Sequence, residues 1–179
     1  MKRNATRVTT FAVASLAALF VPAMAWADDI AIAVHLTGYN ETPVTINSAG
    51  SARFVARISD DETSIEYQLS YGGLSSTVLQ SHIHFGEPAI TGPIVLFLCT
   101  NLGNAPTTVP APQACPAQPA TITGTLTAAS VIANTVGIDS GAAGFAQMVK
   151  AIRAGAAYVN VHTMSHPSGE IRARLKPAD

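Results

Sequence analysis

The sequence predicts an all-β fold, a β-sandwich or Greek-key barrel with one short helix. Apolar and polar residues alternate in most segments of the chain, which places successive side chains on opposite faces of a strand. Turns rich in glycine, proline, asparagine and serine separate these segments at short intervals. Helical spacing of apolar residues occurs in one segment near the C-terminus. Short strands joined by such turns favour two packed β-layers or a closed sheet.

The N-terminal segment 1–27 has the pattern of a secretory signal peptide. Basic residues precede an unbroken apolar run at 11–21, and the small residues of Ala-Trp-Ala form a cleavage site before Asp28. The run is shorter than the about 20 apolar residues that span a bilayer. We therefore expect a secreted or periplasmic protein whose mature chain, 28–179, is one domain without a membrane span.

The charge of the mature chain argues against nucleic acid as a partner. Three of the ten Lys and Arg residues lie in the signal peptide, so seven remain against eleven Asp and Glu, a net charge of −4. Binding to nucleic acid requires clustered basic residues that neutralise phosphates. The mature chain has no such cluster.

Strands are expected wherever apolar residues alternate with polar ones. The run at 92–99 is continuously apolar, which predicts a strand covered on both faces. The segments 51–59 and 63–71 are joined by a tight acidic turn and predict a hairpin, and 156–163 with 170–176 predicts a second hairpin at the C-terminus. The remaining strands are expected at 30–38, 77–86 and 120–128.

One amphipathic helix is expected within 139–155. Asp139 or Ser140 supplies an N-cap side chain, and Gly155 ends the helix. The apolar positions at helical spacing are Phe145, Met148, Val149 and Ile152.

Two cysteines, Cys99 and Cys115, are expected to form a disulfide. An even pair of nearby cysteines in an exported chain is most simply oxidised, and a thiol pair that binds copper fits that compartment less well. The enclosed segment is rich in proline, threonine and asparagine and has no periodicity, so it buries little by itself. Closing a loop of this length stabilises a fold by about 3 kcal/mol.

Four of the five histidines fall into two pairs that are candidate metal ligands. His82 and His84 are two residues apart in a predicted strand, so both point to one face, while Ser81, Ile83 and Phe85 point to the other. His162 ends another predicted strand, and His166 lies in the following turn with Met164 between them. Neutral imidazoles suit copper or zinc, and a nearby thioether favours Cu(I).

Spacing alone does not show whether the two histidine pairs meet. Polar residues that alternate out of a strand are common, and these imidazoles also fit simple hydrogen bonding between neighbouring strands. Among the carboxylates, Glu41, Glu87 and Glu170 lie in glycine- or proline-containing turns that can line a site. Glu170 stands beside Arg172, and we expect a solvent-exposed strand face there.

Three blocks of sequence occur in order: LTGYNETPV followed by AGSARF, then SHIHFGEPAITGPIVLFLC, and finally GAAYVNVHTMSHPSGEIRARL. With these blocks the chain resembles the CHRD (chordin-type) domain family, particularly its exported bacterial members. The resemblance implies an immunoglobulin-like or superoxide-dismutase-like β-sandwich or barrel. It also implies that the strands carrying His82, His84 and His162 are neighbours. It implies no settled activity.

The distant similarity to copper-zinc superoxide dismutase limits which metal site is expected. That enzyme's dinuclear site uses more histidines than the five in this chain. A single-metal site therefore remains, with copper favoured over zinc, and with affinity falling as pH drops through about 6.5.

Three functions follow from these observations. The favoured hypothesis is an exported protein that binds one transition metal through His82, His84, His162 and His166. The alternative is a non-catalytic module that binds an extracellular protein or glycan through loops 38–50 and 100–119, with structural histidines. A redox enzyme on a single copper ranks last, because the sequence places no arginine in an open loop where it could guide superoxide to the metal.

Overall fold

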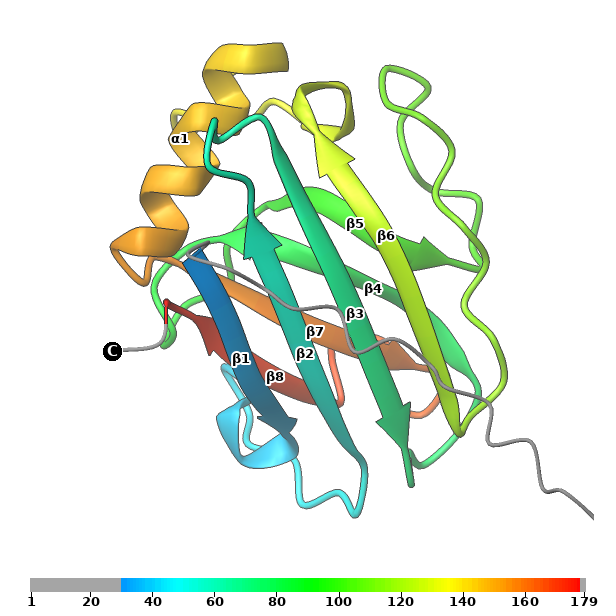
Figure 1. The fold of residues 1–179 in the computed structure, drawn as a ribbon. Helices are drawn as coiled ribbons and strands as arrows, with labels where there is room; N and C mark the ends of the chain where they lie inside the picture. The colour runs from blue at the N-terminus through cyan, green and yellow to red at the C-terminus, as the bar shows by residue number, and fades with distance from the viewer. Residues whose placement is uncertain (1–29, 178–179) are drawn as a thin grey trace, which may run out of the picture.

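The computed structural model describes residues 30–177 as two packed β-layers with one helix across their end (Figure 1). The predicted signal peptide, 1–27, lies outside the described residues. Every expected strand is present, and each begins and ends within two residues of its predicted bounds. The strands are β1 (Ile30–Thr37), β2 (Ser51–Ile58), β3 (Ser64–Gly72), β4 (Val78–Phe85), β5 (Ile94–Thr100), β6 (Ala120–Thr127), β7 (Ala157–Thr163) and β8 (Ile171–Leu175).

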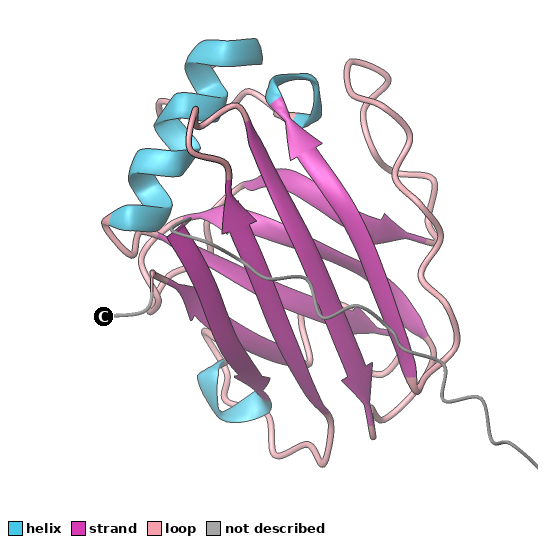
Figure 2. Ribbon diagram, viewed as in Figure 1, coloured by secondary structure: helices cyan, strands magenta, loops and turns pink. Residues whose placement is uncertain are grey.

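All eight strands belong to one antiparallel sheet that folds back on itself (Figure 2). The order is β5-β4-β7-β8-β1-β2-β3-β6, so β5 and β6 are the edges. The two halves, β5-β4-β7-β8 and β1-β2-β3-β6, are joined between β8 and β1 by the single pair Thr37–Arg172. The sheet is therefore a nearly closed barrel flattened into a sandwich, which confirms the predicted all-β fold.

The proline-rich segment between β5 and β6 bridges the open side of the barrel. The Gln113 carbonyl accepts a hydrogen bond from the Thr100 N–H of β5 at 3.0 Å. The Gln113 side-chain amide donates to the Thr123 carbonyl of β6 at 2.9 Å. The predicted disulfide between Cys99 and Cys115 is present and holds this segment to the end of β5. A segment without periodicity thus gains its order from the edges that it connects.

The helix α1 (Gly141–Arg153) lies across one end of the sandwich (Figure 1) and buries the predicted apolar face. Gly155 adopts a positive φ of 68° just beyond it, as expected of a helix-ending glycine. The N-cap prediction is only half right, because Ser140 occupies the N-cap position but makes no side-chain capping bond. Asp139 instead accepts a hydrogen bond from the side chain of Gln147 at 2.8 Å.

The hydrophobic core lies between the two layers. Each strand contributes its inward-facing apolar residues to this core, with α1 closing one end. Ile83 of β4 and Val159 and Val161 of β7 are fully buried members of it. The residues that alternate with them therefore point to the outer face of the β5-β4-β7-β8 layer. His82, His84 and His162 are on that outer face.

Candidate metal centre

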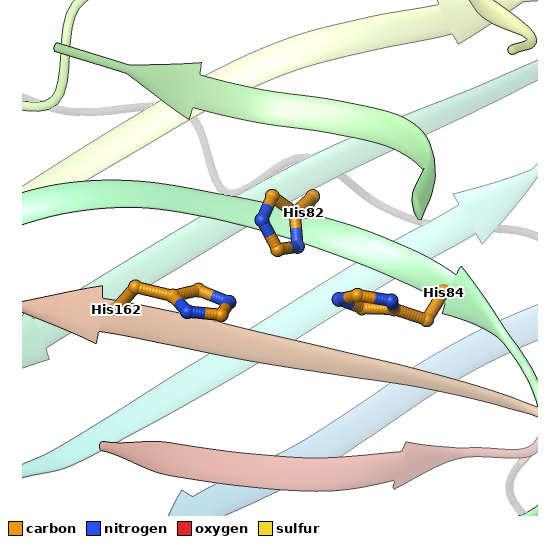
Figure 3. Close-up of side chains that lie close together, drawn as sticks. All are labelled: His82, His84 and His162. Atoms are coloured by element: carbon orange, nitrogen blue, oxygen red, sulfur yellow. The ribbon is translucent and has the colours of Figure 1, made fainter. Parts of the chain in front are cut away.

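Strand pairing brings three of the predicted histidines together. β4 and β7 are antiparallel neighbours, with His82 opposite Asn160, His84 opposite Tyr158, and His162 opposite Gln80. His162 and His84 therefore flank His82 on a common face. Figure 3 shows the three rings side by side on one side of β4 and β7, with the other layer behind these strands.

The three imidazoles form a compact buried group. One ring nitrogen from each lies within 4.8 Å of the others. The ring centroid of His82 is 4.6 Å from that of His84 and 4.5 Å from that of His162. His82 is 0 % exposed, and the other two are each 6 % exposed. The outer face of the layer is thus enclosed at this point.

The other two predicted ligands do not join this group. His166 is half-buried in the turn after β7, where its backbone N–H bonds to Thr163 at 3.2 Å. Met164 is 65 % exposed, so its thioether lies at the surface. The thioether argument for Cu(I) therefore loses its basis, and the site consists of imidazoles.

Aromatic rings from neighbouring strands wall the histidine group. Phe97 of β5 meets the His82 ring edge-on, with centroids 5.4 Å apart. Tyr158 of β7 stacks on His84 at 4.4 Å with an interplanar angle of 9°. The continuous apolar run of β5 predicted a strand covered on both faces. On the outer face of the layer, Phe97 is the residue of this run that packs against the histidine group. That run was the sequence signal for an enclosed site.

Two backbone carbonyls fix the tautomers of His84 and His162. The Nδ1 of His84 is 2.8 Å from the carbonyl oxygen of Gly92, and the Nδ1 of His162 is 2.9 Å from that of Pro167. A carbonyl only accepts, so each Nδ1 carries the proton and donates it. Each Nε2 therefore carries a lone pair rather than a proton, and that of His162 has no hydrogen-bond partner among the described residues. Metal-bound histidines in proteins are oriented by this same type of bond.

Gly92 is required for its carbonyl to reach His84. A Cβ atom at this position would lie 1.8 Å from the carbonyl oxygen of Phe85. No side chain fits there without moving the backbone, so glycine permits the close approach of this turn to β4. In the sequence, this turn (86–93) was a candidate site lining through Glu87 and not through Gly92.

Within residues 30–177, three buried imidazole nitrogens have no hydrogen-bond partner. They are both ring nitrogens of His82 and the Nε2 of His162. The Nε2 of His84 lies 3.2 Å from the side-chain oxygen of Asn160, an amide whose oxygen and nitrogen can be exchanged by a flip. Leaving a buried polar atom unpaired costs about 1–3 kcal/mol. A bound ion is the type of ligand that satisfies several such nitrogens at once.

Burial keeps all three imidazoles neutral. Burial lowers the pKa of His84 to about 4, and the carbonyl of Gly92 only partly offsets this. Burial and the two neighbouring histidines hold the pKa of His82 well below its usual range, and burial lowers that of His162. Asn160 lies near enough to His82 to raise its pKa slightly, although not in hydrogen-bonding geometry. Neutral imidazole is the form that binds metals.

These pKa values revise the pH dependence expected from the sequence. An ordinary histidine takes up a proton near pH 6.5, but His84 stays neutral to about pH 4. Metal affinity is therefore expected to persist well below pH 6.5 rather than to fall through it.

A buried arginine lies behind the histidine group. The Arg172 guanidinium sits 3.3 Å above the Tyr158 ring, whose other face stacks on His84. Arg172 is 3 % exposed and donates to the Thr42 hydroxyl at 2.6 Å and the Ile90 carbonyl at 2.7 Å. Glu41 is also buried, and burial raises its pKa to about 7 against the opposing effect of Arg172.

Glu170 is not on a solvent-exposed face, which corrects the expectation from the sequence. It is 0 % exposed, and its carboxylate accepts hydrogen bonds from Ser48, Ser75 and Thr163. Ser48 and Ser75 are 122 and 95 residues away along the chain, so no local pattern predicts the burial. Glu170 links separate segments of the chain through these hydrogen bonds and contributes no ligand to the histidine group.

The CHRD domain family model matches residues 32–175. This chain belongs to the CHRD domain family. The match spans β1 to β8 and includes the three grouped histidines, as the resemblance implied. Comparison with curated proteins and with solved structures gives no match. Within residues 30–177, no helix is both long and apolar enough to cross a membrane.

Proposed function

We propose that this protein is an exported CHRD domain that binds a single transition metal, copper in preference to zinc, through His82, His84 and His162. The observation that carries the proposal is His82, a fully buried imidazole with both nitrogens unpaired. The carbonyl-fixed tautomers of the other two histidines support it, because they direct two further lone pairs to the same place. The disulfide supports export, since such bonds persist in oxidising compartments.

The spacing of the three nitrogens suits one ion after a small closure. Two imidazole nitrogens, each about 2.1 Å from one ion, are at most about 4.2 Å apart. The three nitrogens lie within 4.8 Å of one another, so a pair at that limit must close by at least about 0.6 Å for one ion to bind both.

Substitution of the ligands is expected to abolish metal binding. The mature protein should bind one equivalent of copper, and His82→Ala/His84→Ala should bind it at least about 100-fold more weakly, because outer partners alone are worth 10–100-fold. Isothermal titration or competition with a chromophoric chelator measures this. Zinc titration in parallel tests the preference for copper.

Two histidine variants serve as matched controls. His35→Ala removes an exposed imidazole from β1 in the other layer, and His166→Ala removes one from the turn after β7. Both should retain wild-type affinity. Equal and weak binding by the wild type and the double variant would refute the metal site.

The alternative function, a module that binds an extracellular protein or glycan, draws support from exposed apolar residues in the two predicted loops. Tyr39 is 67 % exposed, Val44 is 65 % exposed, and Leu102 is 48 % exposed. Large apolar side chains held in solvent are typical of interaction surfaces when they cluster. Under this alternative, capture of a partner from extracellular material persists undiminished in chelator and in His82→Ala/His84→Ala.

A further inference from the structure

We propose that the histidine group selects copper as Cu(I) and disfavours the divalent ions Cu(II) and Zn(II). This inference rests on the metal site proposed above and adds the oxidation state of its ion. Three features of the surroundings carry it: the absence of negative charge among the ligands, a buried arginine behind them, and the number of donors.

The three ligands carry no negative charge that could compensate the positive charge of a bound ion. It consists of three histidines, and no Asp, Glu or Cys of the described residues belongs to it. The groups that orient His84 and His162 are neutral carbonyls rather than carboxylates. The free energy of moving an ion out of water grows with the square of its charge, so the desolvation of a divalent ion costs about four times that of a monovalent ion of the same size.

Arg172 adds to this cost for a divalent ion. Its guanidinium is buried and packs on one face of the Tyr158 ring, and His84 stacks on the other face of that ring. The ring therefore separates the charge of Arg172 from the histidine group. Its hydrogen bonds to the Thr42 hydroxyl and to the carbonyls of Glu87 and Ile90 leave its charge in place. Glu41 is the acid that interacts with it, but this carboxyl is itself buried and partly protonated at neutral pH. The repulsion from Arg172 doubles when the bound ion carries two charges.

The number of donors also favours Cu(I). Zinc in proteins takes four ligands, and Cu(II) prefers tetragonal surroundings, so both require donors beyond the three histidines. Phe97 and Tyr158 occupy two sides of the group with apolar rings. Asn160, 3 % exposed and beside His84, offers a further side-chain oxygen, and it is neutral. Three imidazoles alone suffice for Cu(I).

The direct test compares the affinities of the mature protein for the three ions. Cu(I) is titrated anaerobically against a Cu(I)-specific chelator, and Cu(II) and Zn(II) against their own chelators at the same pH. We expect Cu(I) to bind at least tenfold more tightly than Cu(II), which places the potential of bound copper at least about 59 mV above that of aqueous copper. We also expect Cu(I) to displace Zn(II).

A single added charge provides a second test. Asn160→Asp introduces a carboxylate of nearly the same shape into the wall of the site and should reduce the preference for Cu(I) over Cu(II) at least tenfold. Gln68→Glu adds the same charge on the exposed face of β3 and should leave the preference unchanged. If Asn160→Asp fails to fold, the potential of copper in the wild type decides alone.

The outcomes separate this inference from the metal site itself. Tighter binding of Cu(II) or Zn(II) than of Cu(I), abolished in His82→Ala/His84→Ala, would overturn the selectivity and leave the site standing. Failure of all three ions to bind would refute the site.

Discussion

Replacement of Glu170 by alanine is expected to lower the free energy of unfolding by about 3 kcal/mol, because buried hydrogen-bond donors lose a charged acceptor. The carboxylate accepts from the Ser48 hydroxyl at 2.5 Å and from the Thr163 hydroxyl at 2.6 Å. It also accepts from the backbone N–H and the hydroxyl of Ser75, at 2.8 and 2.7 Å. Hydrogen bonds to a charged group contribute about 1.5–3 kcal/mol each before the cost of burying that charge is subtracted.

The position of Glu170 explains why the loss of its hydrogen bonds affects several parts of the fold. Ser48 lies between β1 and β2, Ser75 lies between β3 and β4, and Thr163 ends β7. One carboxylate therefore joins connections from both layers at one end of the sandwich. The hydrogen bonds outweigh the effect of burial and hold the pKa of Glu170 below its usual range, so the carboxylate is charged at neutral pH.

Denaturant unfolding at pH 7 measures the effect of this substitution. Glu170→Gln keeps the shape and one acceptor oxygen but places an amide NH₂ where an acceptor is needed, so we expect a smaller loss than for alanine. Glu66→Ala, on the exposed face of β3, is the matched control and should change stability by less than about 0.5 kcal/mol. A loss for Glu170→Ala as small as that of the control would show that these hydrogen bonds contribute nothing net.

The strands of this fold were predictable because their signal is local. Alternation along 77–86 and 156–163 placed His82, His84 and His162 on faces opposite the apolar residues, and the structure confirms those faces. The period of two fixes orientation within each strand regardless of what the strand pairs with. That β4 and β7 are neighbours could not be predicted from alternation, because strand pairing depends on the topology of the whole chain. The resemblance to the family implied it.

Enclosure of the histidine face was only partly predictable. The apolar run of β5 indicated a covered face, but the carbonyls of Gly92 and Pro167 that orient two ligands come from turns without periodicity. The glycine at position 92 permits the close approach, but nothing in a sequence indicates which group a backbone carbonyl will bond. Glu170 was mispredicted for a related reason: its partners Ser48 and Ser75 are 122 and 95 residues away along the chain.

The metal-free protein is expected to lose stability as the pH falls from 6.5 to 5. His84 has a pKa of about 4 in the folded protein and about 6.5 when unfolded, so within this range the unfolded chain binds a proton that the folded protein does not. His82 and His162 have lowered pKa values and act in the same direction. Their contribution to stability is fully present above pH 6.5 and is lost as the pH falls toward the folded values.

Glu41 opposes this loss over the same range. Its pKa is about 7 in the folded protein against 4.5 when unfolded, so here the folded protein binds the extra proton. One such carboxyl offsets about one histidine, and the lowered pKa values of His82 and His162 leave a net uptake of protons on unfolding. Each proton taken up contributes a slope of about 1.4 kcal/mol per pH unit.

Two variants separate these contributions in denaturant unfolding across pH 5–6.5. Glu41→Gln removes the opposing group and should steepen the profile by up to about 1.4 kcal/mol per pH unit, whereas His82→Ala/His84→Ala should flatten it. Saturating copper should raise stability at every pH in this range, because the ion binds only the folded arrangement of ligands. Stability of metal-free Glu41→Gln that stayed constant or rose on acidification would mean that the histidine group is protonated or open to solvent in the folded protein. In that event the neutral, enclosed nitrogens on which metal binding depends would not exist.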